Sequence, residues 1–297
     1  MHQPFTIFYA HQVAENPVSY YPENFILVED FRKQLCWLKK RFKVISLSEA
    51  VVRNKQGDDL RNCVALTFDD GFRSTYDLIA PILAEEKLLA TFFVNNNTID
   101  NQQFIWRTAL LYIQNKVPNE GIHHALSHMK RTSKKVDLRK ISNLWRMNEK
   151  EERLVKLWNR CHLPPVQSVL DYLKPYMTSQ QIQSLHQAGF EIGGHTASHP
   201  FCNHLTMNEL QTEIIESNND LETKLDIPIR HFSYPFGNRP DESLENELFQ
   251  NSKIKTVLGI DYYIHNGDNP MQWNRIKMEN TLLKTKLMMN VHRFLGK

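Results

Sequence analysis

A short apolar segment that ends in two adjacent carboxylates constrains this chain more than any other feature of its sequence. Residues 63–68 read Cys-Val-Ala-Leu-Thr-Phe, and Asp69, Asp70 and Gly71 follow at once. An apolar run of this length that stops at a glycine is typical of a buried β-strand. Because carboxylates are costly to bury unpaired, we expect Asp69 and Asp70 to meet a metal ion, a cation or a substrate.

A second segment carries two histidines after a glycine break. Glu191 and Ile192 precede a Gly-Gly pair, and His195 and His199 follow it. A spacing of four places both imidazoles on one side of a helical turn or tight loop, where they can bind one ion. Taken alone, an Asp-Asp-Gly triplet is more often a turn, and two histidines at this spacing are common on surfaces. Their joint appearance at two strand ends favours one metal site.

Strand and helix patterns alternate along the chain. Besides residues 63–68, strands are expected at 5–9, 90–94, 229–234 and 255–259. The 4-3-4 spacing of apolar residues predicts a helix along one face, formed by Phe31, Leu35, Leu38 and Phe42. The alternation predicts an α/β fold, a parallel barrel rather than a sandwich.

Capping patterns locate further helices. Ser46 with Glu49, and Thr206 with Glu209, form two capping boxes, the second before a helix that ends near Leu225. Residues 282–294 are expected to form a C-terminal helix.

Residues 101–175 interrupt the alternation and are predicted to be mostly helical. The segment is rich in basic residues and histidines, namely Lys130, Arg131, Lys134, Lys135, Arg139, Lys140, His123, His124 and His128. A solvated helical excursion is the usual explanation of such a charge run. The alternative is a lid or platform that meets a phosphorylated or acidic glycan at the barrel rim.

Composition is that of a globular enzyme. With 297 residues, 41% hydrophobic, the chain is long enough for one barrel-sized domain. A formal net charge of +3, with no nucleic-acid motif, predicts no nucleic-acid partner. The four cysteines are widely spaced and are expected to be free thiols in the core, Cys36, Cys63, Cys161 and Cys202. No signal peptide or membrane-spanning run is evident, so a cytoplasmic location is expected.

Three motifs resemble those of the NodB-type polysaccharide deacetylases, carbohydrate esterases built on a distorted (β/α) barrel. Residues 67–71, Thr-Phe-Asp-Asp-Gly, and 195–199, His-Thr-Ala-Ser-His, are similar to the first two family motifs. Residues 232–237, Phe-Ser-Tyr-Pro-Phe-Gly, resemble the third motif in its Tyr-Pro-Phe-Gly form. The resemblance extends from near Phe5 to Arg275, and it implies one catalytic domain over residues 1–297 with the helical insertion at about 101–175.

The resemblance implies a role for each motif residue. Asp69 would be the catalytic base, and Asp70, His195 and His199 would bind a divalent metal. One carboxylate and two neutral imidazoles suit zinc, with cobalt, nickel or manganese as alternatives. Such an ion can polarise an N-acetyl carbonyl while Asp69 accepts a proton.

The third motif would supply the oxyanion and substrate contacts. The resemblance implies that the backbone N–H of Phe236 stabilises the oxyanion, with Pro235 fixing the turn and Tyr234 beside it. His11, after the first strand, is expected on the same face as a substrate contact or a structural hydrogen-bonding group. Trp106 is expected either to stack on a sugar ring or to be a buried anchor.

Two departures from the family pattern stand out. Many members carry an arginine where this chain has Ser233, so the group that orients Asp69 is missing; Arg275 is the candidate replacement, an ordinary surface arginine the alternative. The late Leu-x-His motif, which supplies the general acid, has no clear match; His265 and His292 are candidates, and a proton relayed through Asp69 could replace them.

Together these patterns predict a metal-dependent hydrolase that removes N-acetyl groups from amino sugars of a polysaccharide, oligosaccharide or glycan precursor. One alternative is an amidohydrolase that acts on a small cyclic amide or ureide. The other is a catalytically silent glycan-binding relative, suggested by the missing arginine and the unassigned acid.

Overall fold

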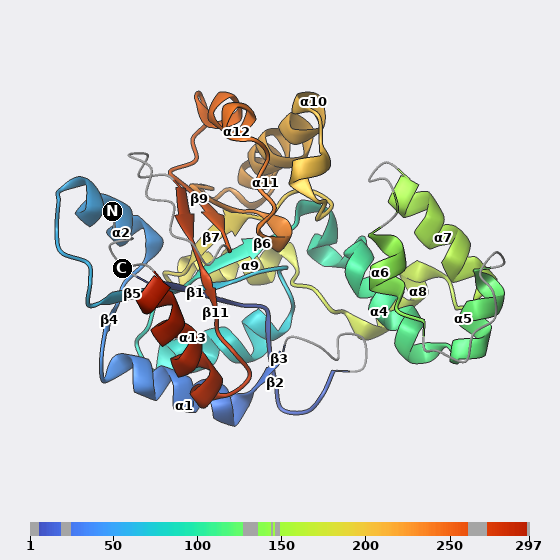
Figure 1. Cartoon of the computed structure of the whole chain (residues 1–297), viewed down its shortest axis with the longest axis horizontal. Helices are drawn as coiled ribbons and strands as arrows, with labels where there is room; N and C mark the ends of the chain where they lie inside the picture. Colours follow the sequence, from blue (N-terminus) through green and yellow to red (C-terminus); the bar gives the residue numbers. More distant parts are fainter. Residues whose placement is uncertain are drawn as a thin grey trace.

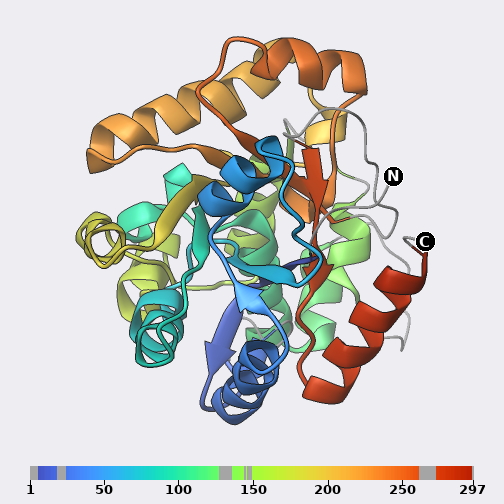
Figure 2. The same ribbon diagram turned by 90° about the vertical axis from the view of Figure 1, so that its left-hand side faces the viewer.

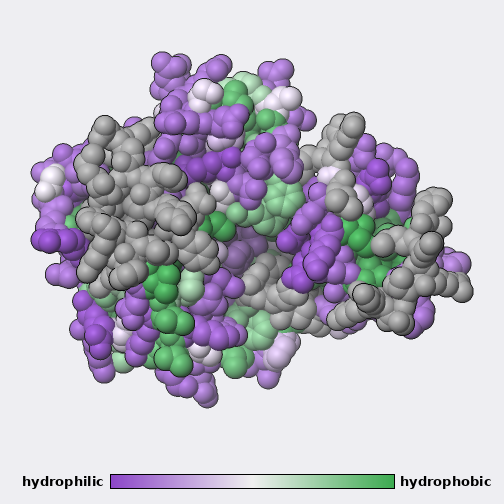
Figure 3. Space-filling model, in the orientation of Figure 1, coloured by the Kyte–Doolittle hydropathy of each residue, from purple (hydrophilic) through white to green (hydrophobic). Residues whose placement is uncertain are grey.

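The computed structural model describes residues 6–18, 25–126, 136–143, 145, 149–260 and 272–295. Figure 1 shows a strand-built body surrounded by helices, with a bundle of helices projecting from one side. Figure 2 shows the same body from its left-hand side, with helices covering the outer surface of the strands. Figure 3 shows that hydrophilic side chains predominate on the face seen in Figure 1, with hydrophobic ones in small groups.

Nine strands form one sheet in which every recorded pairing is parallel. In spatial order the main path reads β10-β9-β8-β7-β6-β5-β1-β11, and β4 pairs with β5. The strands are β1 (Thr6–Ala10), β4 (Lys43–Val44), β5 (Cys63–Phe68), β6 (Thr91–Val94), β7 (Glu191–Gly194), β8 (His231–Ser233), β9 (Thr256–Gly259), β10 (Gln272–Asn274) and β11 (Ile276–Lys277). A separate pair joins β2 (Gln12–Ala14) to β3 (Phe25–Leu27).

One residue closes the barrel. Strands β10 and β11 lie at opposite ends of the sheet path, yet only Arg275 separates them in the chain. The final segment thus pairs with β9 through residues 272–274 and with β1 through residues 276–277. The nearly closed parallel sheet confirms the predicted distorted (β/α) barrel.

The body carries most of the helices. They are α1 (Val28–Lys39), α2 (Leu47–Lys55), α3 (Ala80–Glu85), α9 (Ser179–Gln187), α10 (Met207–Leu210), α11 (Ser217–Leu225), α12 (Glu242–Phe249) and α13 (Leu282–Leu295). Short 3-10 or π turns complete them at Thr75–Ile79, Asn96–Asn101, Cys202–His204, Gln211–Glu216 and Pro235–Gly237.

The expected elements match the observed ones to within a few residues. The predicted strands at 63–68, 90–94, 229–234 and 255–259 correspond to β5, β6, β8 and β9. Thr206 and Glu209 form the full capping box, and the helical run that follows ends at Leu225. Phe42 lies beyond the end of α1 at Lys39, so the prediction that it belongs to that helix is wrong.

Strand β5 is buried along its whole length because both of its faces are covered. Val64, Leu66 and Phe68 pack in the cluster shared with the surrounding helices, whereas Cys63 and Ala65 belong to a second cluster with residues such as Phe93 and Trp273. This two-sided burial explains why the strand reads as a continuous apolar run rather than an alternating one.

The excursion at 101–175 is helical where it is described. It contains α4 (Trp106–Lys116), α5 (Asn119–Ala125), α6 (Leu138–Ser142), α7 (Lys150–Arg160) and α8 (Val166–Leu173), which share a hydrophobic cluster of their own. Phe72 joins that cluster from the barrel and stacks on Tyr176 at 5.5 Å. Of the basic run, Lys130, Arg131, Lys134, Lys135 and His128 lie outside the described residues.

All four cysteines are free, as predicted, but they are not all core residues. Cys63 and Cys202 are buried, Cys161 is partly buried and Cys36 is exposed on α1. The expectation that Cys36 is buried is wrong, because it lies on the face of α1 opposite Phe31, Leu35 and Leu38. Within the described ranges, every helix is too short or too polar to traverse a bilayer.

Candidate metal and catalytic site

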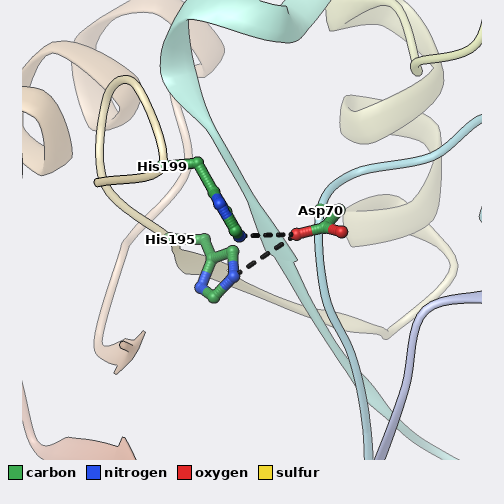
Figure 4. Close-up of side chains that lie close together, drawn as sticks. All are labelled: Asp70, His195 and His199. Atoms are coloured by element: carbon green, nitrogen blue, oxygen red, sulfur yellow. Dashed lines mark ion pairs between the residues drawn. The ribbon is translucent and has the colours of Figure 1, made fainter. Parts of the chain in front are cut away.

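The two motif segments meet at the carboxyl ends of neighbouring strands. Asp70 follows β5, and His195 and His199 follow β7, separated from β5 only by β6. Figure 4 shows both imidazole rings directed at the carboxylate of Asp70. Asp70 Oδ1 lies 3.4 Å from His195 Nε2 and 3.1 Å from His199 Nε2. The three side chains are buried, with one candidate ligand atom from each within 4.8 Å of the others.

These distances suit a metal ion between the three groups. Ligand atoms of a tetrahedral zinc site, each about 2.0–2.1 Å from the ion, stand about 3.3 Å apart. The two measured separations bracket that value. One carboxylate and two imidazoles also leave further coordination positions open, as a hydrolytic site requires.

Hydrogen bonding around the cluster also supports a metal ion between the three side chains. His195 Nδ1 lies 2.6 Å from the carbonyl oxygen of Ser233, which fixes that nitrogen as the donor and leaves Nε2 as a lone pair facing Asp70. Asp70 Oδ1 is buried and forms no hydrogen bond of acceptable geometry with any described residue, although Nε2 of both histidines faces it. Acceptors that face one another in a buried site require a cation between them.

Protonation preferences agree with ligation. Burial lowers the pKa of His199, although Asp70 opposes this, so the imidazole is held neutral. Burial opposes ionisation of Asp70, but the imidazoles of His199 and His195, when they carry a proton toward it, outweigh burial and hold the pKa of that carboxyl well below its usual range. A neutral histidine beside an ionised carboxylate is the state in which both can bind a metal.

Asp69 forms a bidentate ion pair with Arg275. Arg275 Nη1 and Nη2 lie 2.7 and 2.8 Å from the two carboxylate oxygens of Asp69, and both side chains are buried. Burial opposes ionisation of Asp69, but the charge of Arg275 prevails and lowers the pKa of the carboxyl. The predicted pairing of Arg275 with Asp69 is therefore present, and the surface-arginine alternative is wrong.

The other donors of Arg275 are occupied as well. Its guanidinium donates to Ser233 Oγ at 2.6 Å, to Thr67 Oγ1 at 3.1 Å and to the Gly259 carbonyl at 3.4 Å. Ser233 stands where many family members have an arginine. In this structure its hydroxyl accepts a hydrogen bond from Arg275, which comes from the segment that closes the barrel. Thr67 was not singled out from the sequence, although it belongs to the first motif.

Left-handed backbone conformations gather at the site. Asp70, Thr196, His199 and Phe236 have φ values of 72°, 68°, 62° and 57°. Non-glycine residues adopt this region at a cost, and such conformations cluster where surrounding structure holds a functional geometry. The turns that present the candidate ligands are thus held in place by the fold rather than by local preference.

Trp106 supports the site from behind. It is 7% exposed, and its indole N–H donates to the carbonyl oxygen of His199 at 2.8 Å. Phe201 and Phe236 pack on its ring at 5.8 and 6.0 Å, and the Lys150 ammonium lies 3.9 Å from the ring centroid. These contacts support the buried-anchor alternative over the sugar-stacking one.

A cavity of about 170 Å³ unites the predicted site residues other than Trp106 and Pro235. It is lined by His11, Asp69, Asp70, His195, His199, Tyr234, Phe236 and Arg275, and by Arg107 and Thr108 from α4. Arg107 was not predicted; its position at the start of the excursion, next to Trp106, was the available signal. His11 Nδ1 is buried and forms no hydrogen bond with a described residue.

The third motif forms part of the cavity wall. Pro235 is buried at the start of a short 3-10 turn, and Tyr234 is fully buried beside it. The Phe236 ring meets the His199 ring edge-on at 4.6 Å. Of the two candidate general acids, His265 lies outside the described residues, and His292 lies in α13 at a position whose side chain is not described.

Comparison with solved structures gives the same fold. A de-N-acetylase from Aggregatibacter actinomycetemcomitans is similar with a TM-score of 0.62 and 16% identity, over 96% of this chain and 99% of that one. The Streptococcus pyogenes deacetylase PplD, in complex with acetate, has a TM-score of 0.61 and 15% identity over 97% of both chains. IcaB from Ammonifex degensii has a TM-score of 0.59 and 15% identity, over 99% of this chain and 97% of that one.

Sequence comparison supplies the family. No curated protein matches the chain significantly. The profile described as polysaccharide deacetylase matches residues 56–250, which is more than half of the chain and includes the three motifs. With the barrel and the convergent motif residues described above, this match shows that the chain belongs to the polysaccharide deacetylase family, hydrolases that act on carbon–nitrogen bonds.

Proposed function

We propose that this protein is a metal-dependent N-deacetylase that hydrolyses the acetamido group of an amino sugar in a glycan, oligosaccharide or glycan precursor. One observation carries the proposal: Asp70, His195 and His199 converge in the same cavity as the buried Asp69–Arg275 pair. A ligand cluster alone could be structural, but an ionised carboxylate held beside it is what a hydrolytic reaction needs.

Asp70, His195 and His199 would hold the ion, and a divalent ion there would polarise the acetyl carbonyl and make the attacking water more acidic. Zinc suits this ligand set, with cobalt, nickel and manganese as the alternatives. His195 is oriented by its bond to the Ser233 carbonyl, and His199 by the support of Trp106 beneath its backbone.

Asp69 would accept the proton of the water as its oxygen attacks the acetyl carbon. Arg275 keeps Asp69 ionised and fixes both carboxylate oxygens, so the base is available at neutral pH. The backbone N–H of Phe236 would stabilise the developing oxyanion. The bond from carbon to nitrogen then breaks, and the products are acetate and a free amine.

We propose that the proton that Asp69 takes from the water passes to the leaving amine through His11, whose pKa burial lowers, so that its imidazole starts neutral and can take up and release that proton. His11 lines the catalytic cavity, and its buried Nδ1 has no other hydrogen-bonding role among the described residues. A leaving amine needs a proton, whereas an activated phenolate does not. His11→Asn should therefore slow release of acetate from an amide by about 10²-fold, and affect an aryl acetate much less; an equal loss on both substrates would exclude this role.

The pairing of Ser233 with Arg275 supports placement in the Tyr-Pro-Phe-Gly subgroup. It also removes one of the two reasons for the silent-binding alternative, namely the missing arginine. Arg275, between β10 and β11, supplies the cation that orients Asp69.

The decisive experiment measures acetate released from N-acetylated oligosaccharides and sugar nucleotides by zinc- or cobalt-loaded protein. Asp69→Asn and His195→Ala should each abolish turnover, and only His195→Ala should also lose the metal. Ring opening of cyclic amides or ureides, without acetate from any glycan, would instead support the small-amide alternative. Stoichiometric metal with no turnover on either panel would contradict an enzymatic role.

A further inference from the structure

Helix α13 presents a stripe of exposed hydrophobic side chains. Leu283 is 78% exposed, Leu287 61% and Val291 38%, and they follow one another at intervals of four residues. Residues four apart lie on the same side of a helix, so the three form one stripe about 12 Å long. Figure 3 shows a run of hydrophobic side chains at the place where Figure 1 shows α13.

The opposite side of α13 attaches the helix to the barrel. Thr285 and Met289 are buried, and each lies two positions from a residue of the stripe, which is about 200° around the helix. Thr285 Oγ1 accepts a hydrogen bond from the Glu279 N–H at 2.8 Å and donates one to Gln34 Oε1 of α1 at 2.7 Å. The helix is thus fixed with its stripe directed away from the body.

The other exposed hydrophobic side chains do not gather in this way. Among the described residues, the remaining large ones stand each on a different element, namely Leu27, Val52, Leu89, Val155 and Tyr172. Single exposed hydrophobic residues are normal on a protein surface, whereas a contiguous group bordered by polar residues marks an interaction surface.

Positive charges border the stripe on both sides. Lys284 follows Leu283 and Lys286 precedes Leu287, which places the two lysines on opposite flanks of the stripe. No ion pair joins either ammonium to a carboxylate of a described residue. The sequence of residues 282–295 also contains Arg293 and has no aspartate or glutamate. The helix therefore combines an apolar stripe with positive charge alone.

A tryptophan from α1 extends this face. The Lys286 ammonium lies 5.7 Å from the centroid of the partly exposed Trp37 ring, and the Arg41 guanidinium lies 6.0 Å from it. Tryptophan rings favour the boundary between water and lipid headgroups, where lysines can lay their stems on apolar surface and extend their charge into water. Asp30 and Glu279 line a cavity together with Lys284, so the positive end of the face is the one near Trp37.

We propose that this basic apolar face, formed by Leu283, Leu287, Val291, Lys284, Lys286 and Trp37, binds the surface of an anionic lipid membrane. Such a surface takes the apolar side chains at the boundary of the acyl chains and the lysines among the headgroup phosphates. A second copy of the chain, bound symmetrically, would place the lysines against their own copies. A soluble polyanion would leave the leucines in water. The proposal goes beyond the deacetylase function and does not depend on it.

The test mixes the full chain with lipid vesicles and measures the bound fraction by sedimentation. Vesicles of phosphatidylcholine with about one-third phosphatidylglycerol should bind the protein at least about tenfold more tightly than vesicles of phosphatidylcholine alone. Added salt should weaken the binding, because it screens the attraction between the lysines and the headgroups.

Paired substitutions separate the two contributions. Leu283→Gln with Leu287→Gln should lower affinity for the anionic vesicles about tenfold by removing the apolar contact. Lys284→Gln with Lys286→Gln should lower it by about tenfold or more and reduce its salt dependence. Val155→Gln with Tyr172→Gln is the matched control. Those side chains are 46% and 86% exposed on the helical excursion, which projects from the body away from α13 in Figure 1, and this variant should bind like the wild type.

Several results would overturn the proposal. They are no binding to the anionic vesicles, equal binding to both kinds of vesicle, or a loss in the excursion control equal to that in the leucine variant. A dimer, seen by analytical ultracentrifugation and abolished only in the leucine variant, would assign the face to a second copy instead. Acetate release from a soluble oligosaccharide tests the deacetylase function separately, because none of the substituted side chains lines the catalytic cavity.

Discussion

Two polar clusters, each containing a buried histidine, occupy opposite ends of the same barrel strands, and they differ in how completely their hydrogen bonds are satisfied. At the amino ends, Glu191 accepts from the backbone N–H groups of Leu47 and Ser48 and from Thr91 Oγ1. His231 bonds Ser48 Oγ at 3.0 Å and Thr256 Oγ1 at 2.7 Å. Each polar atom of these two side chains has a partner, so the amino-end cluster is closed.

At the carboxyl ends, the cluster of Asp70, His195 and His199 is open. Asp70 Oδ1 and His199 Nδ1 have no hydrogen-bond partner among the described residues, and neither has Nδ1 of the adjacent His11. Buried polar atoms are nearly always satisfied, so a concentration of unsatisfied ones marks a place where a ligand belongs. The comparison teaches that burial and histidine content do not separate a structural cluster from a functional one, whereas unsatisfied hydrogen bonds do.

The largest expected contrast is between His195→Ala and His231→Ala. Both imidazoles are 2% exposed, so the two substitutions remove the same group from equally buried sites. His195→Ala should remove a metal ligand and lower kcat/KM by roughly 10³-fold or more, with substoichiometric metal by elemental analysis. His231→Ala should cost about 1–3 kcal/mol of unfolding free energy and leave kcat/KM within about threefold. Equal activity loss in two folded variants would end the distinction.

Arg275→Met tests the ion pair with Asp69 at the carboxyl ends of the strands. It leaves Asp69 buried without its partner, which should cost about 3–5 kcal/mol of stability and lower kcat/KM by roughly 10²–10³-fold through loss of the ionised base. Urea unfolding and acetate release measure the two effects. Arg53→Met is the control, because Arg53 pairs with Asp58 at 2.9 Å and contacts Cys63 at the amino end of β5, at the opposite end of that strand from Asp69. Stability should fall there without a comparable loss of activity; a reverse pattern would contradict the role of Arg275.

Trp106→Phe should have a smaller effect. The substitution keeps an aromatic ring but removes the hydrogen bond to the His199 carbonyl. Groups that orient metal ligands typically contribute about 10–100-fold in metal affinity, and we expect the lower end of that range by competition with a chelator. Trp158→Phe removes a similar bond, to the Pro164 carbonyl at 2.7 Å inside the excursion, and should leave metal affinity unchanged. Equal affinities in both variants would show that Trp106 does not position His199.

The smallest expected effect concerns pH. Burial lowers the pKa of His231 from 6.5, so the unfolded chain takes up a proton near pH 6.5 and the folded protein does so only at lower pH. Stability should therefore fall as pH drops below about 6.5, by up to about 1.4 kcal/mol per pH unit for this one group. Urea midpoints between pH 7.5 and 5.5 should fall less steeply in His231→Gln than in the wild type. Identical slopes would contradict a neutral His231.

Much of the fold was predictable because its signals are local. The apolar run of β5, the capping box at Thr206 and the alternation of strands and helices depend on neighbouring residues, and each appears in the structure. Errors occurred where local pattern and packing diverge. Phe42 keeps the helical spacing but follows the end of α1, and Cys36 lies in an apolar stretch but faces solvent.

The site was predictable to the extent that its residues are adjacent in sequence. Asp69 and Asp70 share one strand end and His195 and His199 one loop, so spacing sufficed to group them. The sequence by itself determined the barrel class and which carboxylates and imidazoles could bind a metal. Only the tertiary structure decided that Arg275 pairs with Asp69 in place of the missing arginine and that Trp106 is an anchor. The reason is physical: the fold brings these side chains together across 206 residues for Arg275 and Asp69 and across 93 residues for Trp106 and His199, and spacing along the chain carries no information over such separations.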